Sequence, residues 1–300
     1  MFRRRDGIPT LTTPIVTPFD RSRKVDLKQF TTLLDCLVDR GIENVMVGGT
    51  TGEFASLSSH ELERLVFTCK DHIGNTSNIA VGGAPSSTTA ACEWLEMIES
   101  AGVDSGVVTA PYFHNSNSTE GLIEFFEVLN DASSIPLILY NIPAYVGETL
   151  PIEVVSKISQ LDRFVGIKDS SSDLSYGLKL IDATSEDFAV IQGFDPLLIA
   201  SLQMGFDGGV NALSNVVPEI YLSIMDNPTL ADSNELQHRI IEPLFRLCSD
   251  YGFAPATKAA LAYRGWLASA TVRPPLTCVK PHDVAHAMQS IFDSVDISSS

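Results

Sequence analysis

Apolar residues follow two alternating spacings along this chain. Short apolar runs rich in β-branched residues indicate buried strands, whereas apolar positions at i, i+3, i+4 and i+7 indicate amphipathic helices. The strand-like runs are residues 8–19, 43–50, 78–83, 106–111, 136–141, 164–168, 190–193 and 208–211. Helical spacing recurs between them, over residues 30–37, 62–69, 91–98, 122–129 and 195–204, and again from about Pro218.

This alternation predicts the fold. A strand and a helix recur about every 30 residues, which favours a parallel sheet with helices packed on it. Eight such units predict an α/β fold of the (β/α)8 TIM-barrel type. An open doubly wound sheet is the alternative, but it would be expected to carry a GxGxxG turn after the first strand, and the sequence has none there.

The C-terminal part of the chain changes character. Apolar residues at helical spacing predict a helix over residues 240–248, a second over 257–267, and a last one before the serine-rich end. So short a helical segment would bury little surface alone. We therefore expect residues 1–228 to form the barrel and residues 229–300 to form a C-terminal helical extension of the same domain.

Composition excludes some partners. The net charge is −17, with 37 acidic and 20 basic residues, so a nucleic-acid partner is not expected. The acidic excess fits either a high-salt cytoplasm or ordinary solubility. The five cysteines are widely spaced without a CxxC pair, which favours free thiols and a cytoplasmic location. No apolar run is long enough to span a bilayer, and none resembling a signal peptide follows the arginines at positions 3–5.

Two strand ends carry the candidate catalytic residues. Tyr140 and Lys168 each close an apolar run, and the carboxyl ends of barrel strands form the active site of this fold. Burial disfavours the charged form of lysine, and the neutral amine can attack a ketone to form a Schiff base. A phenol one strand away can move the protons of that reaction. The alternatives are a surface lysine that begins a loop and a tyrosine that only packs.

Other strand ends supply candidate substrate contacts. The segment GGTTGE, residues 48–53, places Gly49, Thr50 and Thr51 where backbone N–H groups and hydroxyls can hold a carboxylate, although a plain turn or a phosphate site is also compatible with it. Ser170, Gly193, Asp195 and Asn211 follow later strands, and we expect them to contact substrate. The histidines are scattered, so we expect neither a metal site nor a cofactor.

These motifs together resemble one family. GGTTGE, YNIP, GIKDS and GGVNALSNVVPE occur in the order found in the dihydrodipicolinate synthase / N-acetylneuraminate lyase family of class I, pyruvate-type aldolases, and the resemblance covers roughly residues 8–280. It implies a TIM barrel, usually a homotetramer. It also implies that Lys168 is the Schiff-base residue, that Tyr140 carries protons, and that Thr50 and Thr51 hold the keto-acid carboxylate.

Three positions depart from branches of that family. Tyr145 stands where the synthase branch typically has an arginine for the second carboxylate of aspartate semialdehyde. Phe113 stands where a second tyrosine often completes a proton relay across a dimer contact, and Ala212 stands where the lyase branch tends to have serine. The residues 114–118 contain no lysine or arginine, which favours a substrate without a phosphate.

The resulting hypothesis is a class I aldolase that cleaves a 2-keto-3-deoxy sugar acid, such as 2-keto-3-deoxygluconate, to pyruvate and an aldehyde. Dihydrodipicolinate synthase (4-hydroxy-tetrahydrodipicolinate synthase) and a sugar-acid dehydratase are alternatives on the same scaffold. A barrel that binds a keto acid without chemistry is the alternative of a different class. The expected partner is a small keto acid, with neither nucleic acid nor membrane.

Overall fold

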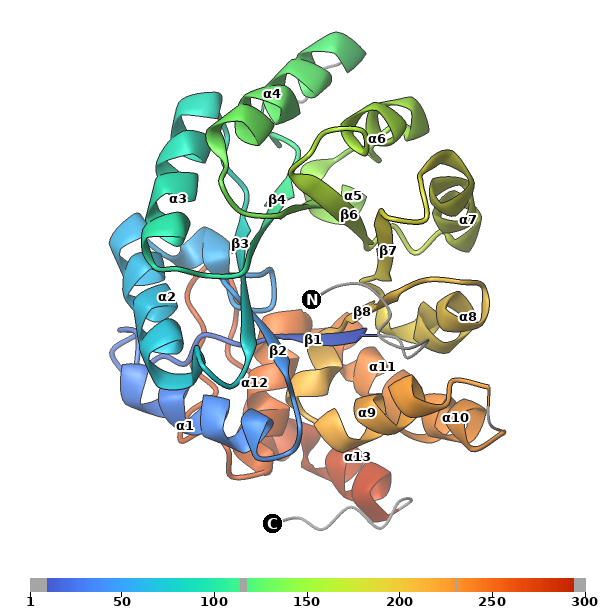
Figure 1. Ribbon diagram of the computed structural model, residues 1–300. Helices are drawn as coiled ribbons and strands as arrows, with labels where there is room; N and C mark the ends of the chain where they lie inside the picture. The colour runs from blue at the N-terminus through green and yellow to red at the C-terminus, as the bar shows by residue number, and fades with distance from the viewer. Residues whose placement is uncertain (1–9, 114–117, 230, 294–300) are drawn as a thin grey trace.

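The computed structural model describes residues 10–113, 118–229 and 231–293, and its centre is a closed barrel of eight parallel strands in sequence order (Figure 1). The TIM-barrel prediction is therefore confirmed. The strands are β1 (Thr10–Pro14), β2 (Asn44–Val47), β3 (Asn78–Gly83), β4 (Ser105–Thr109), β5 (Leu137–Asn141), β6 (Phe164–Asp169), β7 (Ala189–Gln192) and β8 (Gly208–Val210).

Helices surround the barrel and continue beyond it (Figure 1). Those of the barrel part are α1 (Leu27–Val38), α2 (Ser59–Ile73), α3 (Thr88–Ser100), α4 (Thr119–Ala132), α5 (Pro143–Val146), α6 (Ile152–Ile158), α7 (Leu174–Ala183), α8 (Leu198–Gln203) and α9 (Pro218–Asp226). The C-terminal part contributes α10 (Ala231–Leu236), a π-helical turn (Gln237–Ile241), α11 (Glu242–Tyr251), α12 (Phe253–Tyr263) and α13 (Pro281–Asp293). Shorter 3-10 turns span Phe54–Ser56, Asp195–Leu197 and Ala212–Asn215.

The apolar spacing identified the packing faces of the first helices correctly. In α1 the predicted residues Phe30, Leu33, Leu34 and Leu37 are all fully buried. The start of α2 is fixed by a capping box, in which the Ser58 side chain accepts from the Glu61 N–H and the Glu61 carboxylate accepts from the Ser58 N–H. Amphipathic spacing and a local cap thus determine where these helices begin and what they bury.

Three elements differ from expectation. The first strand ends at Pro14 rather than residue 19, because Pro14 and Pro18 lack the N–H that a ladder needs. Helix α12 runs from Phe253 to Tyr263 instead of 257–267. Proline is tolerated in a first helical turn, so Pro255 does not delay its start, and the left-handed Gly265 follows its end. Helix α10 was not expected.

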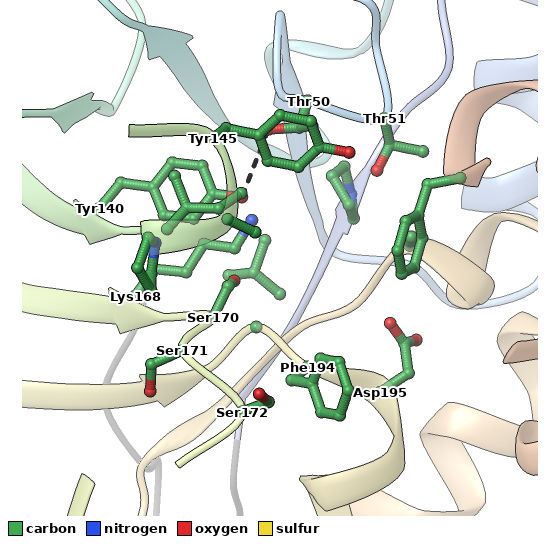
Figure 2. A pocket seen from close by; sticks show the side chains of 18 residues that line it. Thr50, Thr51, Tyr140, Tyr145, Lys168, Ser170, Ser171, Ser172, Phe194 and Asp195 are labelled. Atoms are coloured by element: carbon green, nitrogen blue, oxygen red, sulfur yellow. Dashed lines mark hydrogen bonds between the residues drawn. The ribbon is translucent and has the colours of Figure 1, made fainter. Parts of the chain in front are cut away.

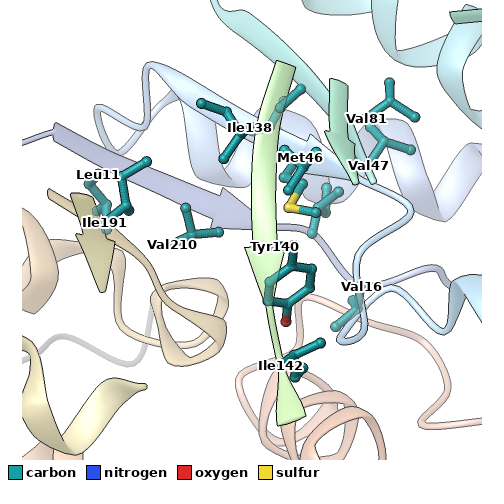
Figure 3. Close-up of a cluster of buried hydrophobic side chains, with 14 of the residues drawn as sticks. Leu11, Val16, Met46, Val47, Val81, Ile138, Tyr140, Ile142, Ile191 and Val210 are labelled. Atoms are coloured by element: carbon teal, nitrogen blue, oxygen red, sulfur yellow. The ribbon is translucent and has the colours of Figure 1, made fainter. Parts of the chain in front are cut away.

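The barrel interior is an apolar core with polar groups at one end. Figure 3 shows Ile138, Tyr140 and Ile142 along β5, with Ile191 from β7 and Val210 from β8 nearby. Residues at alternate positions of a strand share one face, which explains this spacing. Ile138 lies on the amino-terminal side of Tyr140, so the barrel interior beneath the strand ends is apolar there.

Helices α11, α12 and α13 gather at the side of the barrel where β8 meets β1 (Figure 1). Leu244, Ala259, Ala260 and Met288 from these helices belong to the same continuous apolar core as the strands. No helix in the described ranges is long and apolar enough to cross a membrane.

Candidate active site

A cavity of about 170 Å³ opens at the carboxyl ends of the strands. Figure 2 shows Tyr140 and Lys168 on one side of it, Thr50, Thr51 and Tyr145 along another, and Phe194 and Asp195 opposite the lysine. Its lining consists of Pro14, Thr50, Thr51, Tyr140, Ile142, Pro143, Ala144, Tyr145, Lys168, Ser170, Ser171, Ser172, Gly193, Phe194, Asp195, Val210, Ala212 and Phe253. Most of the sequence-predicted site residues therefore meet in one place.

Tyr140 and Lys168 are direct partners in the register of β5 and β6. Partners in parallel strands place their side chains on the same face, so both enter the barrel from neighbouring strands. Lys168 is 4% exposed and Tyr140 is 5% exposed. The Lys168 Nζ lies 4.1 Å from the centroid of the Tyr140 ring. This arrangement presents one amine and one phenol to a substrate held in the cavity.

The residues Thr50 and Thr51 form the wall nearest to the Tyr140 hydroxyl. The Thr50 hydroxyl lies 3.4 Å from the Tyr140 hydroxyl, at hydrogen-bonding distance. Gly49 is not among the lining residues: a Cβ built on it would face Met46, 3.4 Å away, so it faces the core instead. A short 3-10 turn follows this loop, and α2 begins only at Ser59, so the expected helix N-terminus does not directly adjoin the threonines.

Gly193 leaves room for the reactive side chains. A Cβ at this position would lie 2.1 Å from Ser170 Oγ and 2.8 Å from Lys168 Cε. The Gly193 N–H donates to the Asp169 carbonyl at 2.7 Å, which brings β6 and β7 together at this point. The Ser170 hydroxyl is buried and has no hydrogen-bond partner among the described residues, so it is available to a ligand.

Asp195 and Asn211 occupy different environments. Asp195 lines the cavity, but its Oδ1 accepts hydrogen bonds from the Tyr221 hydroxyl and, at 3.3 Å, from the Leu213 N–H. Burial raises the pKa of this carboxyl. Asn211 is fully buried outside the lining, because Val210 and Ala212 beside it take the cavity-facing positions. The expected direct contact of Asn211 with substrate is therefore not supported.

A second pair of residues, not expected from the sequence, lies one position beyond the reactive pair. Asn141 and Asp169 are also register partners, and the Asn141 amide donates to Asp169 Oδ1 at 2.7 Å. Asp169 further accepts from the Ser171 N–H at 3.1 Å and from the Ser171 hydroxyl at 2.9 Å. These bonds fix the ends of β5 and β6 and the loop that carries Ser170 to Ser172.

Two other features bear on the chemistry. Phe253 reaches the cavity from α12, and no local pattern in the sequence could have placed it there. In the described part of the chain, no group of three or more His, Cys, Asp or Glu side chains is placed to hold a metal ion. The expectation about residues 114–118 falls largely outside the described residues.

This fold and site define a class: TIM barrels that act as pyruvate-dependent class I aldolases, with a lysine and a tyrosine at the ends of adjacent strands. Residues 8–292 match the model of the Dihydrodipicolinate synthetase family. The chain belongs to this family.

Curated relatives agree with the assignment. The chain is 32% identical over 280 residues to a 4-hydroxy-tetrahydrodipicolinate synthase from Hyphomonas neptunium, covering 91% of this chain and 93% of the relative. It is 31% identical over 264 residues to 4-hydroxy-tetrahydrodipicolinate synthase 1 of Halalkalibacterium halodurans, covering 86% and 88%. The crystal structure of a dihydrodipicolinate synthase from Bacillus anthracis superposes with a TM-score of 0.88 at 26% identity, covering 96% and 98%.

The names of these relatives favour the synthase, the alternative on this scaffold, over the sugar-acid aldolase that the sequence motifs indicated. The family and the class I aldolase chemistry are confirmed, but the sugar-acid branch is not specifically supported.

Proposed function

We propose that this enzyme is a class I aldolase that cleaves a 2-keto-3-deoxy sugar acid, such as 2-keto-3-deoxygluconate, to pyruvate and an aldehyde. The part of this substrate beyond C3 carries hydroxyls and no charge. The observation that carries the choice of substrate is the charge of the cavity. Among the described lining residues Lys168 is the only cationic side chain, and the imine consumes its amine. A second carboxylate on the substrate would have no cation there, whereas the hydroxyls of Ser170 and Ser172 suit a polyhydroxylated tail.

The proposed mechanism uses each residue at its observed place. The keto-acid carboxylate binds at Thr50 and Thr51, and the Lys168 amine attacks the C2 carbonyl. Tyr140 gives its phenolic proton to the carbinolamine hydroxyl, which leaves as water and gives an iminium that accepts the electron pair of the C3–C4 bond. The Tyr140 phenolate then takes the proton of the C4 hydroxyl as that bond breaks and the aldehyde departs. Protonation of the enamine at C3 and hydrolysis of the imine then release pyruvate.

The second candidate is 4-hydroxy-tetrahydrodipicolinate synthase, favoured by the names of the relatives. It uses the same imine but condenses it with aspartate semialdehyde, whose own carboxylate must be bound. At the mouth of the cavity Tyr145 is 64% exposed and offers a phenol where the synthase branch typically has an arginine. The two candidates therefore differ in the partner of pyruvate and share Lys168.

One set of assays separates them. Borohydride with pyruvate should attach a reduced adduct to Lys168, located by peptide mass spectrometry, and Lys168→Ala should give none while keeping the wild-type circular dichroism spectrum. Release of pyruvate from 2-keto-3-deoxygluconate supports the aldolase. Consumption of aspartate semialdehyde at a higher kcat/KM would favour the synthase instead, and the absence of any adduct on folded wild-type protein would reject both.

The variant Tyr145→Arg tests the substrate argument directly. It should raise turnover with aspartate semialdehyde and leave the pyruvate adduct unchanged, because the added cation lies at the cavity mouth rather than at the imine. An Ala144→Ser variant, changed at the neighbouring lining position without a charge, serves as the control.

A homotetramer and a cytoplasmic location, expected from the family resemblance and from the thiols, stay predictions. Analytical ultracentrifugation at several concentrations would measure the assembly, and a tagged copy in the native host would show the location.

A further inference from the structure

A fully buried ion pair links the C-terminal extension to the loop of Thr50 and Thr51. Lys258 on α12 donates to the Glu53 carboxylate, and both side chains are 0% exposed. The Lys258 ammonium also donates to the Thr271 carbonyl at 2.9 Å and lies 4.1 Å from the centroid of the Phe19 ring. The second Glu53 oxygen accepts from the Arg273 N–H at 3.2 Å. The carboxylate of Glu53 is thus held by residues of distant segments.

A buried ion pair of this kind is weak evidence of a gain in stability. Taking two charges out of water costs several kcal/mol per ion, and packed apolar residues of similar volume often serve as well or better. Burial lowers the pKa of Lys258 to about 8, against the opposing effect of Glu53. Because this pair is costly to bury and joins two distant segments, we ask which part of the structure it holds in position.

The backbone of Glu53 adopts an uncommon conformation. Its φ of 57° and ψ of 35° lie in the left-handed region, which non-glycine residues seldom adopt. In this conformation the Glu53 N–H donates to the Thr50 carbonyl at 3.1 Å, and the next N–H, of Phe54, donates to the Gly49 carbonyl at 3.3 Å. The turn that Glu53 closes is therefore the turn that presents Thr50 and Thr51.

The helix that carries Lys258 also reaches the cavity. Lys258 and Phe253 both lie on α12, with Lys258 more than one helical turn after Phe253. Phe253 lines the cavity directly. The turn itself is packed tightly: Thr17 donates to the Gly52 carbonyl at 2.6 Å, and a Cβ on Gly52 would lie 3.0 Å from the Ile15 carbonyl. The threonine loop is thus fixed from the barrel on one side and from α12 on the other.

We infer that Glu53 and Lys258 are positioning residues for the keto-acid carboxylate: their ion pair sets the Thr50–Thr51 turn at the distance from Lys168 that imine formation requires. The inference rests on the proposed function, because it assigns the threonines to the carboxylate. Neither residue lines the cavity, so both act through the turn and not by contact with substrate.

Three variants test it. Lys258→Met leaves a buried carboxylate without its cation. The double variant Glu53→Gln/Lys258→Met removes both charges and keeps similar volumes, so it can fold where the single variant does not. Glu53→Asp keeps both charges but shortens the side chain by one methylene, which must pull the turn or lengthen the pair. The exposed pair Arg239–Glu235, on the same extension, provides the matched control as Glu235→Gln/Arg239→Met.

The readout is the pyruvate concentration that gives half-maximal borohydride labelling of Lys168, measured beside the circular dichroism spectrum and Tm. We expect Glu53→Asp and the double variant to fold and to need roughly ten times more pyruvate, with labelling complete at saturation. The control should match the wild type. A structural role would lower Tm without this shift in pyruvate concentration.

Each other outcome is decisive. Folded variants that label at the wild-type pyruvate concentration would overturn the inference, and so would failure of all three variants to fold, because the pair would then serve stability only. If the folded wild-type protein does not label at all, the proposed function fails first, and the inference falls with it for a distinguishable reason.

Discussion

The amine of Lys168 lies over the ring of Tyr140, with Nζ 4.1 Å from the ring centroid, because the two residues are register partners on adjacent strands. A substrate attached to that amine would necessarily lie beside the phenol. The phenol in turn is 3.4 Å from the hydroxyl of Thr50, so the proposed nucleophile, proton carrier and carboxylate site are consecutive neighbours around the cavity.

Replacing Tyr140 by phenylalanine removes the proposed proton carrier and leaves the ring that packs against Lys168. Turnover should fall by roughly 10²–10⁴-fold, the usual effect of losing a general acid–base group. Pyruvate should still label Lys168 under borohydride, although more slowly. Steady-state kinetics and the labelling time course measure both effects, and unchanged turnover would remove Tyr140 from the mechanism.

Replacing Gly193 by alanine should block the site. The added Cβ would meet Ser170 Oγ at 2.1 Å and Lys168 Cε at 2.8 Å, so one of these side chains must move. We expect loss of labelling and turnover and a destabilisation of about 1–3 kcal/mol, typical of overpacking. In α4, Gly121→Ala is the control, since its Cβ would meet nothing closer than 3.7 Å. Wild-type kinetics in Gly193→Ala would show that the cavity adapts.

Replacing Asp169 by leucine would remove the carboxylate that joins the ends of β5 and β6. The Asn141 amide would lose its acceptor, which costs about 1–3 kcal/mol for a buried group. We expect a lower Tm on heating and a lower kcat, because the ends that carry Tyr140 and Lys168 would separate. The variant Asp169→Asn keeps a side-chain oxygen that can accept from Asn141, so it should retain part of both, and equal losses in the two variants would argue against this pairing.

The ion pair between Glu61 and Arg273 predicts an acid dependence of stability. Hydrogen bonds from Arg273 are the largest cause that lowers the pKa of Glu61 from 4.5 to about 2. A carboxyl with a lowered pKa in the folded state stabilises fully above its ordinary pKa and loses this contribution as the pH falls towards 2. At neutral pH, Glu61→Gln should therefore cost about 1 kcal/mol, allowing for partial exposure of the pair to solvent.

The measurement is the free energy of unfolding of wild type and Glu61→Gln between pH 7 and pH 2. The two curves should converge as the pH falls below 4.5, because protonation removes the charge that the variant already lacks. The exposed Glu127, changed to glutamine, is the control and should follow the wild-type slope. Parallel curves would mean that the Arg273 contacts do not depend on the charge of Glu61.

The barrel could be predicted from the sequence because its information is local. Apolar runs and helical spacing, such as that of Phe30 to Leu37, report directly which face each element buries. Lys168 and Tyr140 could be identified because each follows such a run. Boundaries were less accessible: Pro255 reads as an interruption in a sequence, yet it lies in the first turn of α12, where its missing N–H costs nothing.

The parts of the site that were missed depend on contacts between distant segments. Phe253 enters the cavity from a helix of the extension, and the direction of Asn211 depends on which residue of β8 faces inward. Lys258 offered the same signal as Lys168, a lysine among apolar residues from Ala254 to Leu261, but its partner lies 205 positions away and no local pattern names it. The sequence therefore identifies Lys258 as unusual, but only the tertiary structure shows that its partner is Glu53.

The Glu53–Lys258 pair also limits how such chains can be recombined. A hybrid that takes its barrel from one relative and its C-terminal helices from another inherits one half of this pair from each parent. Unless both parents carry the matching charge, the hybrid buries a lone ion beneath the threonine turn, a change that costs several kcal/mol. For protein engineering, the unit to exchange is therefore the loop of residues 48–54 together with residues 253–273, although some 200 residues separate them in the chain.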